Sequence, residues 1–201
     1  MNIKNLNREL KTKQKELDEL VRRKLPVIVG RMAKSHYQEN FRRSGFVNDG
    51  LHAWPPVKRR NSGDDAASRN KPLLSGRNLL YGSLKYVPSD YRVKVSNDVI
   101  YAPVHNWGAT LKPTVTPKMR KYAWYRYYKA SPKKKGEKGK RKGSLQVSEN
   151  SEAAKWKGLA LTKKTKLSVK IPQRQFLGQS KELDDAIRKE IDKRTNNILN
   201  V

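Results

Sequence analysis

The sequence lacks cysteine, contains only three histidines and has no long apolar run. Without thiols the chain cannot form a disulfide, a thiolate zinc site or a cysteine nucleophile, which fits a reducing compartment. Residues 1–20 are polar and charged, so we expect no signal peptide, and no segment approaches the roughly 20 apolar residues of a membrane span. We therefore predict a soluble, cytoplasmically assembled protein with no membrane partner.

Groups that support catalysis are also scarce. The three histidines are His36, His52 and His105, and the carboxylates are scattered through polar stretches. Their spacing does not suggest a metal site or an acid–base pair, and no glycine-rich loop precedes a lysine and a hydroxyl as phosphate binding requires. We interpret His105 as a corner residue bonded to backbone rather than part of a nuclease centre. The sequence predicts no enzyme, no metal and no cofactor.

Acidic residues are few, and basic residues outnumber them 46 to 18, so the net charge is +28. Such a surplus attracts polyanions, with nucleic acid as the first partner to consider and acidic protein surfaces as the second. Residues 112–174 contain 20 basic and 3 acidic residues. Most of the surplus therefore belongs to one segment of the chain.

Apolar residues make up only 35% of the 201 residues, which suffices for one packed domain with an appendage. We assign residues 1–111 and 167–201 to a single core domain and residues 112–166 to an inserted basic and aromatic arm. The lysine run at 131–144 has low complexity, so we expect it to be disordered or to order only on a partner.

Both ends of the chain carry apolar residues at helical spacing. The pattern over residues 6–32 predicts a long first helix, in which Pro26 either makes a kink or begins a second helix that ends before Gly45. Ser180 is positioned to cap a closing helix whose apolar residues recur over 183–191. We expect these helices to cover one face of a small antiparallel sheet, which gives an α+β fold.

Strands are predicted where apolar and polar residues alternate. Residues 91–95 alternate, 96–98 suit a turn, and 99–104 would form the second strand of a hairpin that ends near Pro103 and leads into a structured corner. Upstream, Ser75 is expected to cap a short helical turn that leads into a strand ending near Val87. Downstream, residues 167–171 alternate again and are expected to return the chain to the same sheet.

The segment YAPVHNWG at residues 101–108 resembles a signature of the phage virion morphogenesis, or tail completion, proteins of Mu-like and lambdoid phages. Three more motifs resemble that family in the same order: FRRSGF followed by WPPVKRR, then KPLLSGRNLLYGSLKY, and finally IPQRQFLGQS. The segment between YAPVHNWG and IPQRQFLGQS, residues 109–170, is longer than the loop that the family is expected to have there. The resemblance implies the same α+β arrangement, with a long arm extruded between strands.

The resemblance also implies a function. It indicates a structural virion protein of a tailed phage, assembled in the bacterial host cytoplasm as a neck component at the head–tail junction. Its expected partners are copies of itself in a ring, commonly of six or twelve, other neck, connector or tail-tube proteins, and DNA passing through the lumen. Two alternatives stay open: a basic nucleic-acid-binding accessory protein, and a tail-tube terminator.

Three groups of residues are candidates for interaction sites. The aromatic stretch near residue 125 fits a protein interface better than a platform for single-stranded nucleic acid, although both use such residues. The predicted interface residues are Tyr122, Trp124, Tyr125, Tyr127, Tyr128 and Trp156. The corners of the family motifs are Tyr101, His105, Trp107, Gly108, Phe176 and Leu177. The candidates for phosphate or acidic-partner contacts are Lys133, Lys134, Lys135, Lys138, Lys140, Arg141 and Lys142.

Overall fold

The computed structural model describes residues 3–57, 69–131 and 151–199 of the chain. It divides the protein into two compact units: unit 1 contains Met1–Ala109 and Ile171–Val201, and unit 2 contains Thr110–Lys170. Helices and small antiparallel sheets are present together, so the predicted α+β class is confirmed. The strands form three two-stranded sheets, where the sequence predicted a single sheet.

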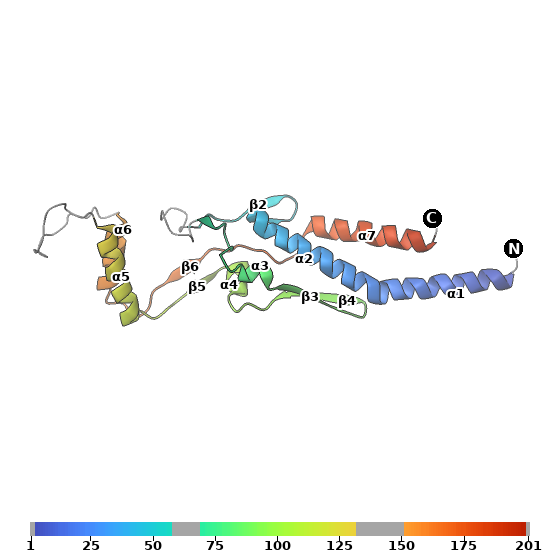
Figure 1. Ribbon diagram of the computed structural model, residues 1–201, viewed down its shortest axis with the longest axis horizontal. Helices are drawn as coiled ribbons and strands as arrows, with labels where there is room; N and C mark the ends of the chain where they lie inside the picture. Colours follow the sequence, from blue (N-terminus) through green and yellow to red (C-terminus); the bar gives the residue numbers. More distant parts are fainter. Residues whose placement is uncertain (1–2, 58–68, 132–150, 200–201) are drawn as a thin grey trace, which may run out of the picture. The chain divides into compact units, whose positions relative to one another are not determined.

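Unit 1 begins with helices α1 (Ile3–Glu19) and α2 (Leu25–Arg43), which are joined by a π-helical turn at Leu20–Lys24 (Figure 1). Pro26 lies in the first turn of α2, where its missing N–H costs no hydrogen bond, so the predicted second helix is confirmed. The helix ends at Ser44, which adopts a left-handed conformation with φ of 55°. The helix therefore ends before Gly45, as predicted, and Gly45 opens the next strand.

Strands β1 (Gly45–Val47) and β2 (Leu51–Ala53) form a short antiparallel hairpin after α2. Helix α3 (Leu79–Gly82) then leads into a second hairpin, formed by β3 (Leu84–Ser89) and β4 (Arg92–Asn97). This second hairpin lies along α2 (Figure 1).

The contact between α2 and the second hairpin is close because Gly30 lies at their crossing. A Cβ atom at this position would overlap the ring of Tyr86 and the side chain of Val93. The tip of the hairpin is held by the helices as well: the Tyr91 N–H donates to the Arg22 carbonyl at 3.0 Å, and the Tyr91 hydroxyl donates to Asp18 at 2.8 Å. The register of the hairpin therefore depends on residues far away in the sequence.

The predicted strand at residues 99–104 is wrong. The chain forms helix α4 (Ala102–Trp107) there, with Pro103 in its first turn, and β4 pairs with the upstream strand β3 instead. Asn97 ends β4 because its side chain donates to the Leu80 carbonyl at 2.6 Å and accepts the Val99 N–H at 3.1 Å. These side-chain bonds to the backbone replace the ladder that a strand over residues 99–104 would have needed.

Helix α7 (Lys181–Leu199) closes unit 1 and packs against α2 and α1 (Figure 1). The Leu183 N–H donates to the Ser180 hydroxyl at 3.3 Å, so the predicted cap at Ser180 is confirmed. A buried cluster lies between α2 and the segments that follow it; its members are Phe41, Trp54, Leu80, Leu84, Ala102 and Phe176.

Unit 2 contains helices α5 (Pro117–Ala130) and α6 (Glu152–Leu161), which pack against each other. The Thr116 hydroxyl caps α5 by accepting the Met119 N–H at 3.2 Å, and the Ser151 hydroxyl caps α6 in the same way. The buried residues of this pair are mostly small: Ala123, Tyr127, Ala153 and Ala160.

The predicted return of residues 167–171 to the main sheet is wrong. β6 (Val169–Ile171) pairs with β5 (Ala109–Leu111) in a two-stranded sheet of its own. The predicted disorder of the lysine run falls almost entirely on residues 132–150, which lie outside the described residues.

Candidate functional site

The last family motif is held in place by a buried asparagine of α4. The Asn106 carboxamide oxygen accepts the backbone N–H groups of Phe176 and Leu177, both at 2.9 Å. Its amide group donates to the Leu177 carbonyl at 3.1 Å. Asn106 is 5% exposed, so these bonds are made away from water, where leaving them unmade would be costly.

Three further side chains hold the same segment from other directions. The Asn40 amide donates to the Phe176 carbonyl at 3.3 Å, the Trp54 indole to the Gln175 carbonyl at 2.7 Å, and the Tyr37 hydroxyl to the Gly178 carbonyl at 2.8 Å. Residues of three motifs that are far apart in the sequence therefore meet at one place. Phe176 has no exposed surface, so it belongs to the core rather than to an outer contact.

Gly108 also has a structural role in this region. Its φ of +72° is unfavourable for other residues, and a Cβ atom would lie 3.0 Å from the Gln173 backbone nitrogen. The neighbouring His105 carbonyl accepts the Arg174 N–H at 2.8 Å. The sequence thus identified a structured corner correctly, although the corner is a helix end rather than a strand end.

The imidazole of His105 is half-buried. Its Nδ1 atom has no hydrogen-bond partner among the described residues, so the backbone bond predicted for this side chain is not seen there. Burial lowers the pKa of His105, and the nearby Arg174 charge lowers it further. The ring is therefore neutral at pH 7, and one of its nitrogens is an acceptor.

One face of α4 is turned toward solvent. Ile100, two residues before the helix, is 92% exposed, Trp107 at its end is 66% exposed, and Pro103 between them is exposed as well. We call these three residues the outer face of α4. The sequence analysis named Trp107 but missed Ile100 and Pro103, because it placed them in a strand.

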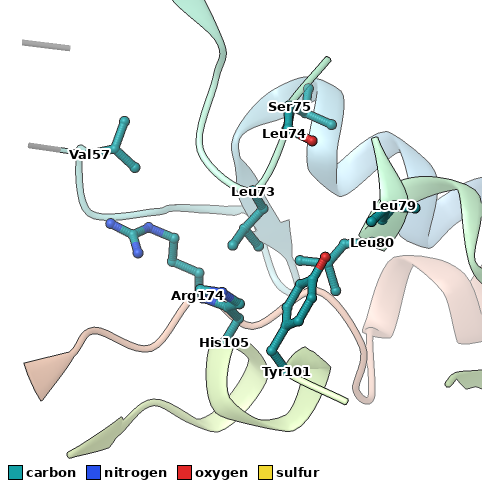
Figure 2. Close-up of a pocket in the computed structure, with 9 residues that line it drawn as sticks. All are labelled: Val57, Leu73, Leu74, Ser75, Leu79, Leu80, Tyr101, His105 and Arg174. Atoms are coloured by element: carbon teal, nitrogen blue, oxygen red, sulfur yellow. The ribbon is translucent and has the colours of Figure 1, made fainter. Parts of the chain in front are cut away.

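A pocket of about 190 Å³ lies on another side of α4. Figure 2 shows Tyr101 and His105 pointing from α4 toward Leu73, with Arg174 beside them. The residues that line this α4 pocket are Val57, Leu73, Leu74, Ser75, Leu79, Leu80, Tyr101, His105 and Arg174. The Arg174 guanidinium donates to the carbonyls of Pro55 and Pro56 at 3.0 and 3.2 Å, which fixes its position in the wall.

The aromatic residues of unit 2 divide into a buried part and an exposed part. Tyr127 is 8% exposed and packs inside the unit, whereas Tyr122, Tyr125 and Tyr128 are 50%, 60% and 65% exposed. We call these three exposed tyrosines the aromatic face. The Trp124 ring stacks on Tyr128 at a centroid distance of 5.9 Å, so it supports this face from beneath.

Trp156 is held on α6 by a small charged cluster. Its indole N–H donates to the Glu152 carboxylate at 3.1 Å, and the Arg126 guanidinium lies 3.0 Å from the same oxygen. Arg126 also lies over the Trp156 ring, 5.1 Å from its centroid. The pKa of Glu152 is lowered, mainly by the hydrogen bond from Trp156 and to a smaller extent by the one from Arg126. The cluster joins α6 to α5 and orients the rings at their contact.

The charge around the aromatic face has one sign. Helix α5 carries Lys118, Arg120, Lys121, Arg126 and Lys129 and no acidic residue. In the described part of unit 2, Glu152 is the only acidic residue. The seven basic residues predicted to contact phosphate or an acidic partner, at positions 133–142, lie outside the described residues.

Residues 3–57, 69–131 and 151–199 contain no group of three or more side chains that could hold a metal ion. Within the same ranges, no helix is long and apolar enough to cross a membrane.

A sequence model of the phage virion morphogenesis family matches residues 1–196 of this chain, which includes both units. No match was found among curated proteins or among solved structures.

Proposed function

The chain belongs to the phage virion morphogenesis family, and from that premise we propose that it is a tail completion protein, a structural component of the phage neck. Membership of the family gives it a part in building the virion. The finer proposal is that copies of the chain form a ring at the head–tail junction. In such a ring, unit 1 supplies the scaffold and unit 2 supplies a binding surface for a neighbouring virion protein.

The observation that carries this proposal is the aromatic face of unit 2. A tyrosine presents a large apolar ring with a polar tip, which is why tyrosine is enriched at protein interfaces. Folding has left three such rings at least half exposed on one helix, although the same helix buries Tyr127. At about 25 cal/mol per Å² of apolar surface, covering these rings would contribute a few kcal/mol to binding.

The charge of unit 2 indicates what kind of protein would cover these rings. Helix α5 has five basic residues and no acidic ones. A surface of this kind is attracted to an acidic partner and repels another copy of itself. We therefore propose that the aromatic face binds an acidic surface of a neighbouring virion protein, and that copies of the chain contact one another elsewhere.

The proposed role needs no catalysis. A head-to-tail contact that repeats around a closed rotation builds a ring, and the ring acts through its shape: its lumen passes DNA and its two rims bind different partners. This proposal agrees with the scarcity of acid–base and metal-binding groups in the sequence. A ring at the end of the tail tube would use the same surfaces, so a tail-tube terminator is a variant of this proposal.

A nucleic-acid-binding accessory protein is the second candidate function. Aromatic rings interleaved with arginine and lysine also grip single strands, and the aromatic face of α5 has this composition. Binding of this kind weakens steeply as salt rises, because each phosphate contact releases counterions. Apolar contacts between subunits are much less sensitive to salt.

The two functions are separated by the mass of the purified protein in solution. We expect a multimer that persists from moderate to high salt and does not require DNA, measured by light scattering behind a sizing column. A monomer that gains mass only with duplex DNA, and loses it in high salt, would replace the ring with the nucleic-acid function.

The binding role of the aromatic face is tested with a triple variant, in which Tyr122, Tyr125 and Tyr128 are changed to serine. We expect this variant to keep the multimer but to lose association with the neighbouring virion protein, measured by co-sedimentation with particles that lack this chain. Leu161→Ser is the matched control, because Leu161 is an apolar residue of unit 2 that is 58% exposed outside the aromatic face. If the triple variant binds as well as the control, the aromatic face is not the contact.

A further inference from the structure

Helix α4 presents three different sides. Ala102 and Asn106 face the core and are buried, Tyr101 and His105 line the α4 pocket, and the outer face faces solvent. Residues four apart lie on the same side of a helix, which explains why each side has its own character. One short helix therefore carries both a protruding tryptophan and the wall of a pocket.

The outer face and the pocket are chemically complementary. The nine residues that line the pocket of about 190 Å³ include four leucines and a valine, and an apolar cavity of about 150 Å³ already holds a benzene ring, so there is room for an indole. The Arg174 guanidinium in the wall is a cation that can lie against an aromatic ring. His105 adds an aromatic imidazole ring to the wall, against which an indole can pack.

The distribution of charge favours this region for contact between identical copies. Each copy carries a net charge of +28, so two copies repel each other over most of their surfaces. Residues 99–109, which contain α4 and its outer face, have no charged side chain, although 32% of all residues are charged. Residues 72–76, three of which line the pocket, also lack charge. Two copies meet at these surfaces with the least repulsion.

We infer that copies of this chain join head to tail, with the outer face of α4 of one copy against the next copy and its Trp107 inserted in the α4 pocket there. A copy cannot fill its own pocket this way, because Trp107 and the pocket lie on different sides of one helix. The contact uses two different surfaces, so it repeats along a series of copies and closes into a ring if the rotation allows it. This inference rests on the proposed function, since it names the contact that builds the proposed ring.

The test uses two variants that each remove one half of the contact. Trp107→Ala removes the inserted side chain and leaves the pocket intact. Leu79→Glu places a charge at the pocket, where Leu79 is 50% exposed, and leaves Trp107 intact. Val87→Glu is the control, because Val87 is 53% exposed in unit 1 and does not line the pocket. The side chains of Trp107, Leu79 and Val87 are all at least half exposed, so we expect all three variants to fold.

We expect each of the two variants to associate at least 30-fold more weakly than the unmodified chain, the loss typical of a central interface tryptophan. Val87→Glu should associate normally. Trp107→Phe keeps an aromatic ring but fills less of the pocket, so its association should fall between that of Trp107→Ala and that of the unmodified chain. Light scattering and native mass spectrometry measure these changes.

Mixing the two variants gives the sharpest result. The mixture retains one intact contact, between Trp107 of the Leu79→Glu copy and the pocket of the Trp107→Ala copy. We therefore expect a one-to-one pair and nothing larger. A contact that does not join Trp107 to the pocket predicts no such rescue, so absence of the pair overturns the inference.

A cross-linking measurement covers the case of weak association. The chain has no cysteine, so Ile100→Cys in one copy and Ser75→Cys in another introduce unique thiols on the outer face and at the pocket. A short bismaleimide should join the mixed pair at high protein concentration and join neither variant to itself. An Ile100→Cys homodimer, or no product at all, contradicts the inference.

The inference and the proposed function fail in different ways. If the unmodified chain is a multimer that both α4 variants leave intact, the ring proposal stands and the contact lies elsewhere. If the unmodified chain stays monomeric and gives no cross-link at any concentration, self-assembly itself is contradicted.

Discussion

Unit 1 and unit 2 differ in what holds them together and in what they expose. In unit 1, side chains from α2, from Trp54 just after β2, and from α4 converge on the segment 174–178, and the sequence carries 27 basic and 15 acidic residues. In unit 2, two short helices pack through alanines and one tyrosine, and the sequence carries 19 basic and 3 acidic residues.

Under the proposed function, this difference divides stability and binding between the two units. Long-range hydrogen bonds in a dry environment specify a single arrangement, which suits a scaffold that must repeat without variation. A small pair of helices with unbalanced charge has little stability of its own and much surface, which suits a segment that gains order and energy from a partner. The comparison predicts that equivalent changes in the two units have different consequences.

The largest expected effect is the loss of the Asn106 side chain in unit 1. Asn106→Ala leaves the buried N–H groups of Phe176 and Leu177 without an acceptor, so we expect the free energy of unfolding to fall by about 3 kcal/mol. Urea denaturation followed by circular dichroism measures this loss. Asn196→Ala on the exposed side of α7 is the control and should change little. An equal loss in the free energy of unfolding for Asn106→Ala and Asn196→Ala would contradict the role of the Asn106 hydrogen bonds in holding unit 1 together.

A smaller effect, confined to unit 2, is expected for Tyr127→Ala. Tyr127 is buried between α5 and α6, so its loss should cost about 2 kcal/mol, while Tyr128→Ala at an exposed neighbouring position should cost almost nothing. Hydrogen exchange read by mass spectrometry should show loss of protection in α5 and α6 and none in α2. Loss of protection in α2 as well would mean that the two units do not unfold separately.

The smallest effect concerns the pH dependence of unit 1. Hydrogen bonds, first of all from the Gly50 N–H, lower the pKa of Glu182 from 4.5 to about 2. A depressed pKa means that the carboxylate stabilises the folded state above pH 4.5, and that this stability is lost as the pH falls toward 2. The Glu182→Gln variant should therefore have a lower free energy of unfolding than the unmodified chain at neutral pH. This difference in free energy should shrink as the pH falls from 4.5 toward 2. A difference in urea midpoint that does not change with pH would contradict this assignment.

The sequence predicted the parts of the fold that have local signals. Proline in the first turn of α2 and serine before α7 act within their own segments, so both elements were found from the sequence alone. Strands near β3 and β4 were predicted, but their pairing was missed because the turn between them is at Asp90 and Tyr91, and Tyr91 adopts a φ of 61° that its sequence does not favour. Bonds to Arg22 and Asp18 hold this turn, and such long-range bonds leave no local pattern.

The two helices of unit 2 were also missed, although a signal was present. Thr116 before Pro117 and Ser151 before Glu152 are strong starts for helices. The aromatic and basic residues of α5 are distributed over all of its sides, so the sequence lacks the apolar periodicity that usually identifies a helix. For the same reason, the sequence did not separate the buried Tyr127 from the exposed tyrosines beside it.

The candidate sites were predicted only in part. The motif segments were identified by resemblance, but the role of Asn106 as their common link depends on the three-dimensional meeting of α4 with residues 176 and 177. The α4 pocket likewise joins residues from four separate segments, with Val57, Leu73, Tyr101 and Arg174 as examples. No local pattern predicts which of these residues share a pocket.

The central claim is that this chain is a structural part of the virion neck, and the most direct test is its position in the particle. Purified virions of the phage that encodes the chain, labelled with an antibody against it and viewed by electron microscopy, should carry the label at the head–tail junction in every complete particle. A protein that is absent from purified virions, or that is found only with packaged DNA inside the head, would contradict the account.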